Sequence, residues 1–180
     1  GWWVCPQPIR AGDVVYSFGV GGDLSFEREM VEVYGARVFA FDPDPGTAER
    51  ARGAPLDGLR FQEMSVGRRD ERRGVRLPGG DEVEARVLRL PSHMRLLGHR
   101  RLDLIRLDVP GAEADVIRDL VSMDVDVHQL LITFHEEETA ESRDRIEAAV
   151  RELHGHGYRA FHISPTRRQF SFIRTDFVTA

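Results

Sequence analysis

The feature that most restricts the fold of this chain is an alternation between short apolar segments rich in β-forming residues and segments with helical periodicity. The predicted strands are residues 14–18, 37–41, 59–65, 102–108, 128–135, 158–163 and 169–174. Two of them, around Phe39 and Leu131, are almost continuously apolar, as strands covered on both faces are. The alternation therefore predicts an α/β fold with crossover helices around a mostly parallel sheet.

Three apolar stripes with a helical period lie between these strands. They are Phe26, Met30, Val33 and Tyr34; then Val116, Ile117, Leu120 and Val121; then Ile146, Ala149, Val150 and Leu153. Gly35 follows the first stripe and suits the left-handed residue that ends many helices. Only residues 164–168 join the last two strands, which is too short for a crossover helix, so these strands should pair antiparallel.

Residues 67–89 interrupt the alternation. They are crowded with Arg, Asp, Glu and Gly, and residues 77–81 read as the turn of a hairpin insertion. The hairpin is either a lid over a site or a solvated connection. A charge run of mixed sign favours the solvated connection.

Composition sets the remaining limits. A chain of 180 residues suits a single domain over residues 1–180. The net charge of −5 gives no reason to expect nucleic acid, and no apolar run is long enough to span a membrane. Cys5 is the only cysteine and the start lacks the features of a secretory signal, so a cytoplasmic location is expected. The chain has no lysine, which excludes Schiff-base chemistry and a phosphate-loop lysine.

A glycine-containing turn between the first strand and the first helix is the main candidate for ligand binding. Gly19 and Gly21 would let the backbone turn tightly and approach a ligand, and the helix that follows favours an anion. A pyrophosphate would need a third glycine, but Leu24 stands in that position. Asp23 would repel a pyrophosphate, whereas it could pair with the ammonium of an amino acid. The turn therefore favours S-adenosylmethionine over a dinucleotide, with a plain structural turn as the alternative.

Asp42 strengthens this hypothesis. It ends the second strand about 20 residues after the glycines, which is where a carboxylate meets ribose hydroxyls in nucleotide-binding α/β folds. A helix-capping role before Pro43 is the alternative.

Four stretches together resemble the FkbM family of methyltransferases and the related methyltransferase-like proteins of animals. They are Val15-Tyr16-Ser17-Phe18-Gly19-Val20-Gly21 with Asp23 and Ser25-Phe26-Glu27; Val38-Phe39-Ala40-Phe41-Asp42-Pro43; the stretch from Asp103 to Glu113; and Gln129-Leu130-Leu131-Ile132-Thr133-Phe134-His135. The resemblance implies a class I, Rossmann-like three-layer sandwich, S-adenosylmethionine as donor, and a small-molecule hydroxyl acceptor such as a sugar. The cofactor-binding residues expected on this basis are Ser17, Phe18, Gly19, Gly21, Asp23, Ser25, Asp42, Pro43, Ser65 and Asp108.

Three positions depart from the family pattern. Ser17 stands where many methyltransferases carry an acid, Pro110 replaces a glutamate after the fourth strand, and Thr133 replaces another before the aromatic–histidine pair. The last two losses motivate an alternative function, a non-catalytic module that keeps the cofactor fold. A nicotinamide-dependent oxidoreductase is a third hypothesis, opposed by Leu24 and by the antiparallel end of the sheet.

Asp108 and His135 are the expected catalytic residues. Each ends a predicted parallel strand, at the edge of the sheet where ligands bind. His135, with an ordinary pKa of about 6.5, would take the acceptor proton, and Asp108 would orient the cofactor or the acceptor. A buried, backbone-bonded imidazole and a helix-capping aspartate are the alternatives, and Glu113 is expected only to favour the start of its helix. No metal is expected, although Asp108, His135 and Glu136 could bind one. A homo-oligomer is compatible with the sequence.

Overall fold

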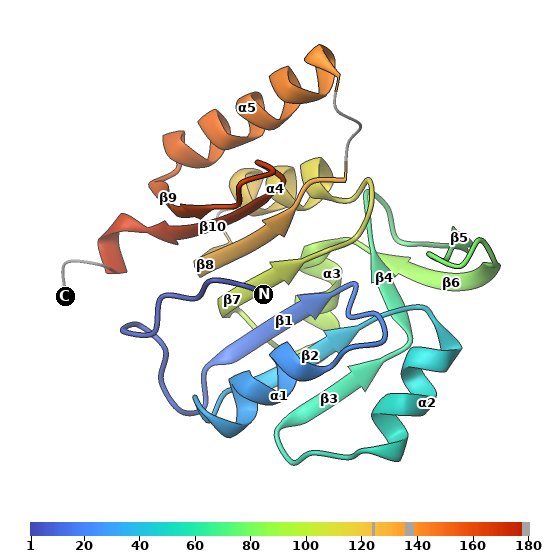
Figure 1. Cartoon of the computed structure of the whole chain (residues 1–180). Helices are drawn as coiled ribbons and strands as arrows, with labels where there is room; N and C mark the ends of the chain where they lie inside the picture. The colour runs from blue at the N-terminus through green and yellow to red at the C-terminus, as the bar shows by residue number, and fades with distance from the viewer. Residues whose placement is uncertain (124, 136–138, 178–180) are drawn as a thin grey trace.

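The computed structural model describes residues 1–123, 125–135 and 139–177 (Figure 1). Within them a seven-stranded sheet has the order β3-β2-β1-β7-β8-β10-β9. The strands are β1 (Val14–Phe18), β2 (Arg37–Phe41), β3 (Leu59–Gln62), β7 (Arg101–Leu107), β8 (Asp126–Thr133), β9 (Tyr158–Ile163) and β10 (Gln169–Arg174). The first five strands in this order pair parallel, whereas β10 pairs antiparallel with both β8 and β9. The expected mostly parallel sheet with an antiparallel end is confirmed.

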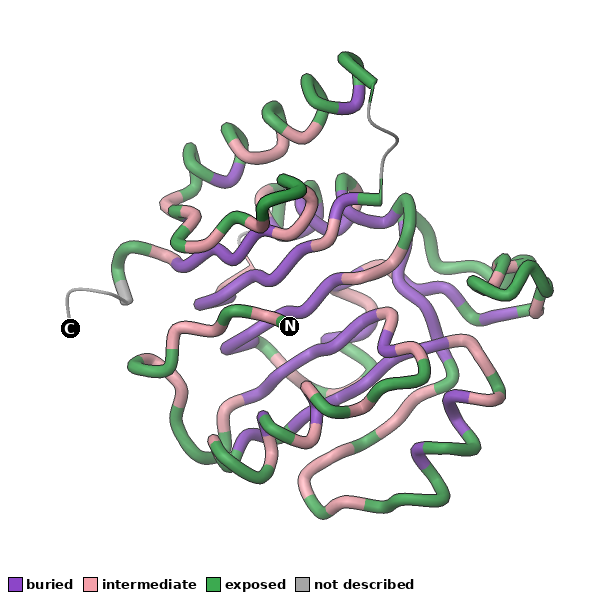
Figure 2. Tube along the Cα trace, in the orientation of Figure 1, coloured by how far each residue is buried: buried purple, intermediate pink, exposed green. Residues whose placement is uncertain are grey.

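Helices cover both faces of this sheet, because its strands bury side chains on both sides (Figures 1 and 2). The helices are α1 (Ser25–Glu32), α2 (Pro45–Gly53), α3 (Leu90–Leu97), α4 (Glu113–Ser122) and α5 (Ala140–Gly155). Met30 of α1 joins a core with Val15 and Val38 on one face. The helices α3, α4 and α5 pack on a larger core on the other face, which includes Phe18 and Leu107. Three layers result, as expected.

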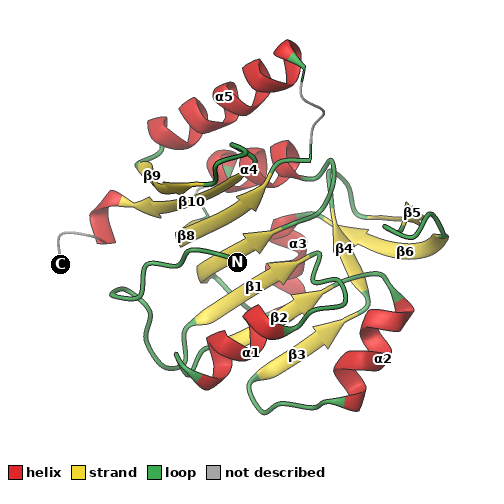
Figure 3. Ribbon diagram, in the orientation of Figure 1, coloured by secondary structure: helices red, strands yellow, loops and turns green. Residues whose placement is uncertain are grey.

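The segment expected to be one strand at residues 59–65 is divided in the structure. β3 ends at Gln62 and pairs with β2, whereas β4 (Met64–Val66) pairs with β6 (Glu82–Leu88) in a separate sheet. That sheet is completed by β5 (Glu71–Arg76), which pairs antiparallel with β6 (Figure 3). The division has a packing cause, because Met64 and Val66 turn into the core shared by α3 and the main sheet.

The expected stripe on the first helix is wrong at one position. Val33 is 68% exposed, whereas Phe26, Met30 and Tyr34 pack against the core. α1 ends at Glu32, so Val33 lies in the C-cap, where the helical period no longer determines which side chains face the sheet.

None of the helices within the described residues combines the length and the apolarity that crossing a bilayer requires.

Candidate active site

The glycine turn after β1 is held against the neighbouring strands. Gly19 adopts a left-handed conformation with a φ of +74°, and its N–H donates to the carbonyl oxygen of Phe41 at 2.9 Å. A Cβ at this position would overlap the carbonyl oxygen of Asp108 and lie 2.7 Å from its carbonyl carbon. Gly19 is therefore required by the close approach of β1 to the end of β7. The space beside Gly19, where a ligand was expected to approach, is filled by the backbone of Asp108.

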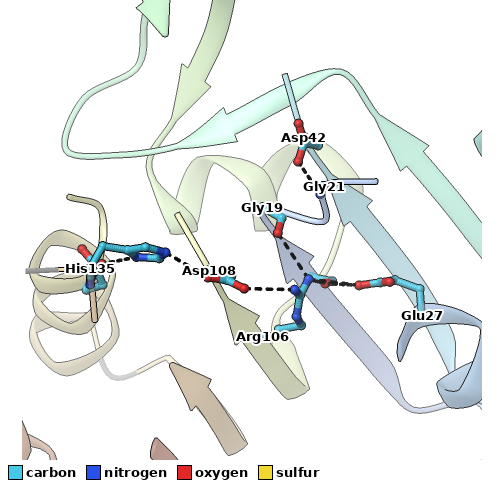
Figure 4. Close-up of polar contacts among 9 residues, drawn as sticks. Gly19, Gly21, Glu27, Asp42, Arg106, Asp108 and His135 are labelled. Carbon is cyan, nitrogen blue, oxygen red and sulfur yellow. Dashed lines mark hydrogen bonds and ion pairs between the residues drawn. The ribbon is translucent and has the colours of Figure 1, made fainter. Parts of the chain in front are cut away.

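Asp42 points its carboxylate at the same turn (Figure 4). Oδ2 accepts the N–H of Gly21 at 2.8 Å, and Oδ1 accepts the N–H of Asp44 at 2.9 Å. Gly21 is also left-handed, with a φ of +65°, but a Cβ added there would meet no atom within 4 Å. The structure thus brings Asp42 to the turn and leaves open space beside Gly21.

Three of the other expected cofactor residues lie at or near the turn. Asp23 is exposed, and its Oδ1 accepts the N–H of Ser25, the first residue of α1, at 2.9 Å, which lowers the pKa of Asp23. Pro43 is half-buried directly after Asp42. Asp23 and Ser25 are thus exposed beside the turn, and Pro43 is half-buried.

Two of the expected residues are placed differently. The side chain of Phe18 is fully buried and stacks on Phe41 with ring centroids 4.6 Å apart, so only its backbone faces the turn region. Ser65 belongs to β4 of the small sheet, and its carbonyl oxygen accepts a hydrogen bond from Nε2 of His93 at 3.1 Å. Alternation along each strand sends Phe18 into the core.

A buried ion pair that sequence reasoning missed lies beneath the turn. Glu27 of α1 is fully buried, and its Oε1 accepts from the hydroxyl of Ser17 at 2.5 Å. Arg106 of β7 is 7% exposed, and its Nη1 lies 3.3 Å from Glu27 Oε1, 3.1 Å from Ser17 Oγ and 3.4 Å from the carbonyl oxygen of Gly19. Burial raises the pKa of Glu27, while the Arg106 charge acts in the opposite direction.

The same arginine connects the turn to the expected catalytic pair. Nη2 of Arg106 donates to Oδ2 of Asp108 at 3.2 Å, and Nε2 of His135 lies 3.0 Å from Oδ1 of Asp108. On the other side of the ring, Nδ1 of His135 lies 2.8 Å from Oε1 of Glu113, which also accepts the backbone N–H of His135 at 3.1 Å. Figure 4 shows most of this row, in which negative and positive groups alternate from Glu27 to Glu113.

These contacts determine the protonation of the pair. Hydrogen bonds to Asp108 and Glu113 raise the pKa of His135 to about 9. Burial raises the pKa of Asp108, but His135 and Arg106 outweigh it, and the net shift is downward. The ordinary pKa expected for His135 is therefore wrong, because two carboxylates hold the imidazolium. Glu113 does more than favour the start of α4, since it binds His135.

We expect this histidine to make the fold less stable in mild alkali. The folded state holds the His135 proton more tightly than the unfolded chain does, so stability is full below about pH 6.5 and is lost as pH rises through about 9. The loss should be roughly 2–3 kcal/mol in the free energy of unfolding. Urea unfolding at pH 6.5 and 9 should show this decline in the wild type and in His154→Asn, an exposed control. It should be absent in His135→Asn, and an unchanged decline in that variant would refute the assignment.

Two open grooves flank the loop after β7. One, of about 430 Å³, runs between α4 and α5 and is lined by Ile117, Phe134, His135 and Ile146 among others. The other, of about 280 Å³, lies between that loop and the hairpin and includes Arg68 and Arg73. Pro110 and Gly111 line both. His135 lines the first groove, and Val109, the residue after Asp108, lines the second.

The two N-terminal tryptophans lie in different surroundings. The ring of Trp2 lies 5.2 Å from the guanidinium carbon of Arg106, and the ring of Phe26 lies 5.7 Å from it. Trp3 stacks on His162 with centroids 4.9 Å apart. Trp2 therefore helps to bury the cation beneath the turn.

The possible metal ligands do not gather into a larger set. Among the described residues, no group of three His, Cys, Asp or Glu side chains could hold a metal ion. Glu136, the third ligand considered from the sequence, lies outside these residues.

Sequence signals existed for the missed ion pair. An arginine in the middle of the apolar strand 102–108 is unusual, because a charged side chain buried in a sheet needs a partner. Glu27 lies on the buried face of α1, one position after Phe26. The pairing itself could not be read from the sequence, since it depends on β1 and β7 being neighbours.

The comparisons with known proteins agree with this geometry. The chain matches the family described as "Methyltransferase domain" over residues 1–178. It is 27% identical over 124 residues to the human "Probable methyltransferase-like protein 24", a match that covers 67% of this chain and 32% of that protein. The chain thus spans about a third of the length of that relative.

Solved structures share the fold at low identity. An rRNA methylase from Streptococcus thermophilus has a TM-score of 0.54 at 11% identity, covering 93% of this chain and 88% of that one. The fibrillarin pre-rRNA processing protein of Methanococcus jannaschii has a TM-score of 0.55 at 12% identity, covering 97% and 70%. The fold is therefore the class I methyltransferase fold.

Proposed function

Because the chain belongs to the methyltransferase-domain family, we propose that it is an S-adenosylmethionine-dependent O-methyltransferase acting on a hydroxyl of a small metabolite or sugar. The observation that carries the proposal is the contact between Asp42 and Gly21 at 2.8 Å beside open space at the glycine turn. It supports the proposal because it brings a carboxylate and open space to the same turn. The motifs around Gly19 and Asp108 support placement near the FkbM group.

The residues at the turn fit this cofactor. The positive end of the α1 helix dipole suits its carboxylate. The carboxylate of Asp42 can accept from two ribose hydroxyls in addition to Gly21 and Asp44, because each oxygen has two lone pairs. Gly19, Ser25, Pro43 and the backbone of Phe18 complete the proposed donor site. We retain Ser65 only as a residue near its margin.

When bound, S-adenosylmethionine supplies an activated methyl group. The chain must then align the acceptor and remove its proton, and alignment alone can contribute roughly 7–11 kcal/mol to lowering the barrier. We propose that Asp108 accepts a hydrogen bond from the acceptor hydroxyl and takes its proton. That proton becomes strongly acidic as the oxygen gains a carbon bond, so a carboxylate with a lowered pKa is basic enough. His135, as an imidazolium, holds this carboxylate in place. It is therefore not the base that was expected from the sequence, and Asp108 takes that role.

The acceptor is proposed to enter by the grooves beside Pro110 and Gly111. The groove next to His135 is largely apolar, and the groove below the hairpin carries Arg68 and Arg73. We propose a small molecule rather than nucleic acid because the net charge is −5. The RNA named for two structural neighbours belongs to those proteins, whose likeness is one of fold. A single domain with a hairpin insertion at about residues 67–89, a possible homo-oligomer and a cytoplasmic location remain proposals from the sequence.

One observation favours the second candidate function, a non-catalytic cofactor-binding module. Both ring nitrogens of His135 are occupied by carboxylates, so the site lacks a free imidazole base. Transfer of labelled methyl groups to a panel of sugars and hydroxylated metabolites separates the two. Donor binding without any transfer would favour the module.

The donor assignment predicts a specific loss of affinity. Asp42→Asn removes the charge that would grip the ribose, and hydrogen bonds to a charged group contribute about 1.5–3 kcal/mol. Calorimetric titration should therefore show S-adenosylhomocysteine binding about tenfold or more weakly than in the wild type. The control is Asp81→Asn in the exposed hairpin turn, which should bind normally. Wild-type affinity in Asp42→Asn, or tight binding of NAD alone, would contradict the proposal.

A further inference from the structure

We infer that Glu27 and Arg106 form the subsite for the amino-acid end of the donor, with Glu27 supplying from α1 the carboxylate that β1 lacks at Ser17. The inference rests on the proposed donor and goes beyond it, since it names the residues that would distinguish the whole donor from its nucleoside part.

The position of Glu27 is the first support. Its carboxylate oxygen Oε1 lies 2.5 Å from the hydroxyl of Ser17. An acid at position 17 would project from the same Cα as that hydroxyl, so the Glu27 carboxylate occupies the region such an acid would reach. Where many methyltransferases have an acid on the strand at position 17, this chain has one ten residues later, on the helix.

Unsatisfied atoms are the second support. Among the described residues, the buried Oε2 of Glu27 and the buried Nε of Arg106 have no hydrogen-bond partner. Leaving a charged atom buried without a partner is costly, and native proteins rarely tolerate it without a reason. One atom is an acceptor on an anion and the other is a donor on a cation. An α-amino acid carries the complementary pair, an ammonium and a carboxylate.

The third support is location. Arg106 lies directly beneath the turn, with Nη1 3.4 Å from the carbonyl oxygen of Gly19 (Figure 4). Trp2 and Phe26 cover the guanidinium, which shields it from water and strengthens its electrostatic interactions. Burial also raises the pKa of Glu27, so an ammonium at Oε2 would favour its charged form.

A purely structural role, in which the pair only supports the turn, makes a different prediction. Loss of support would weaken every ligand of the turn equally. A subsite for the amino-acid end would weaken only ligands that possess that end. The test therefore compares two ligands that share the nucleoside thioether.

The experiment titrates the chain with S-adenosylhomocysteine and with 5′-methylthioadenosine, which lacks the ammonium and the carboxylate. The wild type should bind S-adenosylhomocysteine about tenfold or more tightly. Glu27→Gln should remove most of this preference while its affinity for methylthioadenosine stays within about twofold. Glu29→Gln, on the exposed face of α1, is the matched control and should retain the preference.

A second variant tests the relocation directly. Ser17→Asp combined with Glu27→Gln returns the carboxylate to the strand and should restore the preference for S-adenosylhomocysteine, and this variant decides the question if Glu27→Gln alone fails to fold. An equal loss of both ligands in Glu27→Gln, or equal affinity for both ligands in the wild type, would overturn the subsite. If the wild type binds neither ligand, the proposed function fails and the subsite with it.

Discussion

Replacing Arg106 with methionine is expected to lower the free energy of unfolding by about 3–5 kcal/mol, the cost of breaking a buried ion pair by removing one partner. Arg106 is the only cation in contact with Glu27 among the described residues, and it also binds Asp108. Methionine preserves much of the side-chain volume, so the loss of stability comes from removing the charge and not from a new cavity. Urea unfolding at pH 7 measures it.

A matched control compares this buried ion pair with an exposed one. Arg118→Met breaks an exposed pair with Asp115, whose atoms are 2.6 Å apart, and should cost at most about 0.5 kcal/mol. Adding Glu27→Gln to Arg106→Met should recover part of the loss, because it removes the uncompensated carboxylate. If Arg106→Met lowers the free energy of unfolding no more than Arg118→Met does, the contacts of Arg106 with Glu27 and Asp108 do not stabilise the site.

The strands could be predicted because their signal is local. The strands expected at 14–18 and 37–41 lie where predicted, whereas those expected at 102–108 and 128–135 lie one and two residues earlier, at Arg101–Leu107 and Asp126–Thr133. The strand expected at 59–65 is divided where the chain changes from the main sheet to the small one. The helices α2 and α3 were not predicted. Residues 45–53 offer only small buried side chains, Thr47, Ala48 and Ala51, and α3 is a short helix that follows the hairpin directly.

The site was predictable where it depends on strand ends and not where it depends on strand neighbours. Asp42, Asp108 and His135 each follow a recognisable strand, so their meeting at one edge could be expected. The raised pKa of His135 could not be expected, because it depends on hydrogen bonds to Asp108 and to Glu113 of the following helix. Pro110 and Thr133 were interpreted as lost acids, yet Glu113 brings a carboxylate to His135 from three residues beyond Pro110.

Replacing Gly19 with alanine is expected to abolish donor binding, with affinity for S-adenosylhomocysteine falling at least about a hundredfold. A Cβ there would overlap the backbone carbonyl of Asp108, and backbone cannot rotate away as a side chain can. The left-handed φ of +74° adds a strain of about 1–2 kcal/mol for any residue with a Cβ. To relieve both, β1 must separate from β7, which breaks the hydrogen bond from Asp108 N–H to the Phe18 carbonyl oxygen at 3.0 Å.

Gly12→Ala is the matched control for this prediction. Gly12 has a φ of +88°, but a Cβ there meets no atom within 4 Å and the residue lies before β1, away from the turn. The backbone strain should therefore lower the free energy of unfolding of this variant, whereas its affinity for S-adenosylhomocysteine should not change. Calorimetry and urea unfolding on both variants distinguish strain from overlap. Equal binding by Gly19→Ala and Gly12→Ala would show that the close approach of β1 to β7 does not shape the donor site.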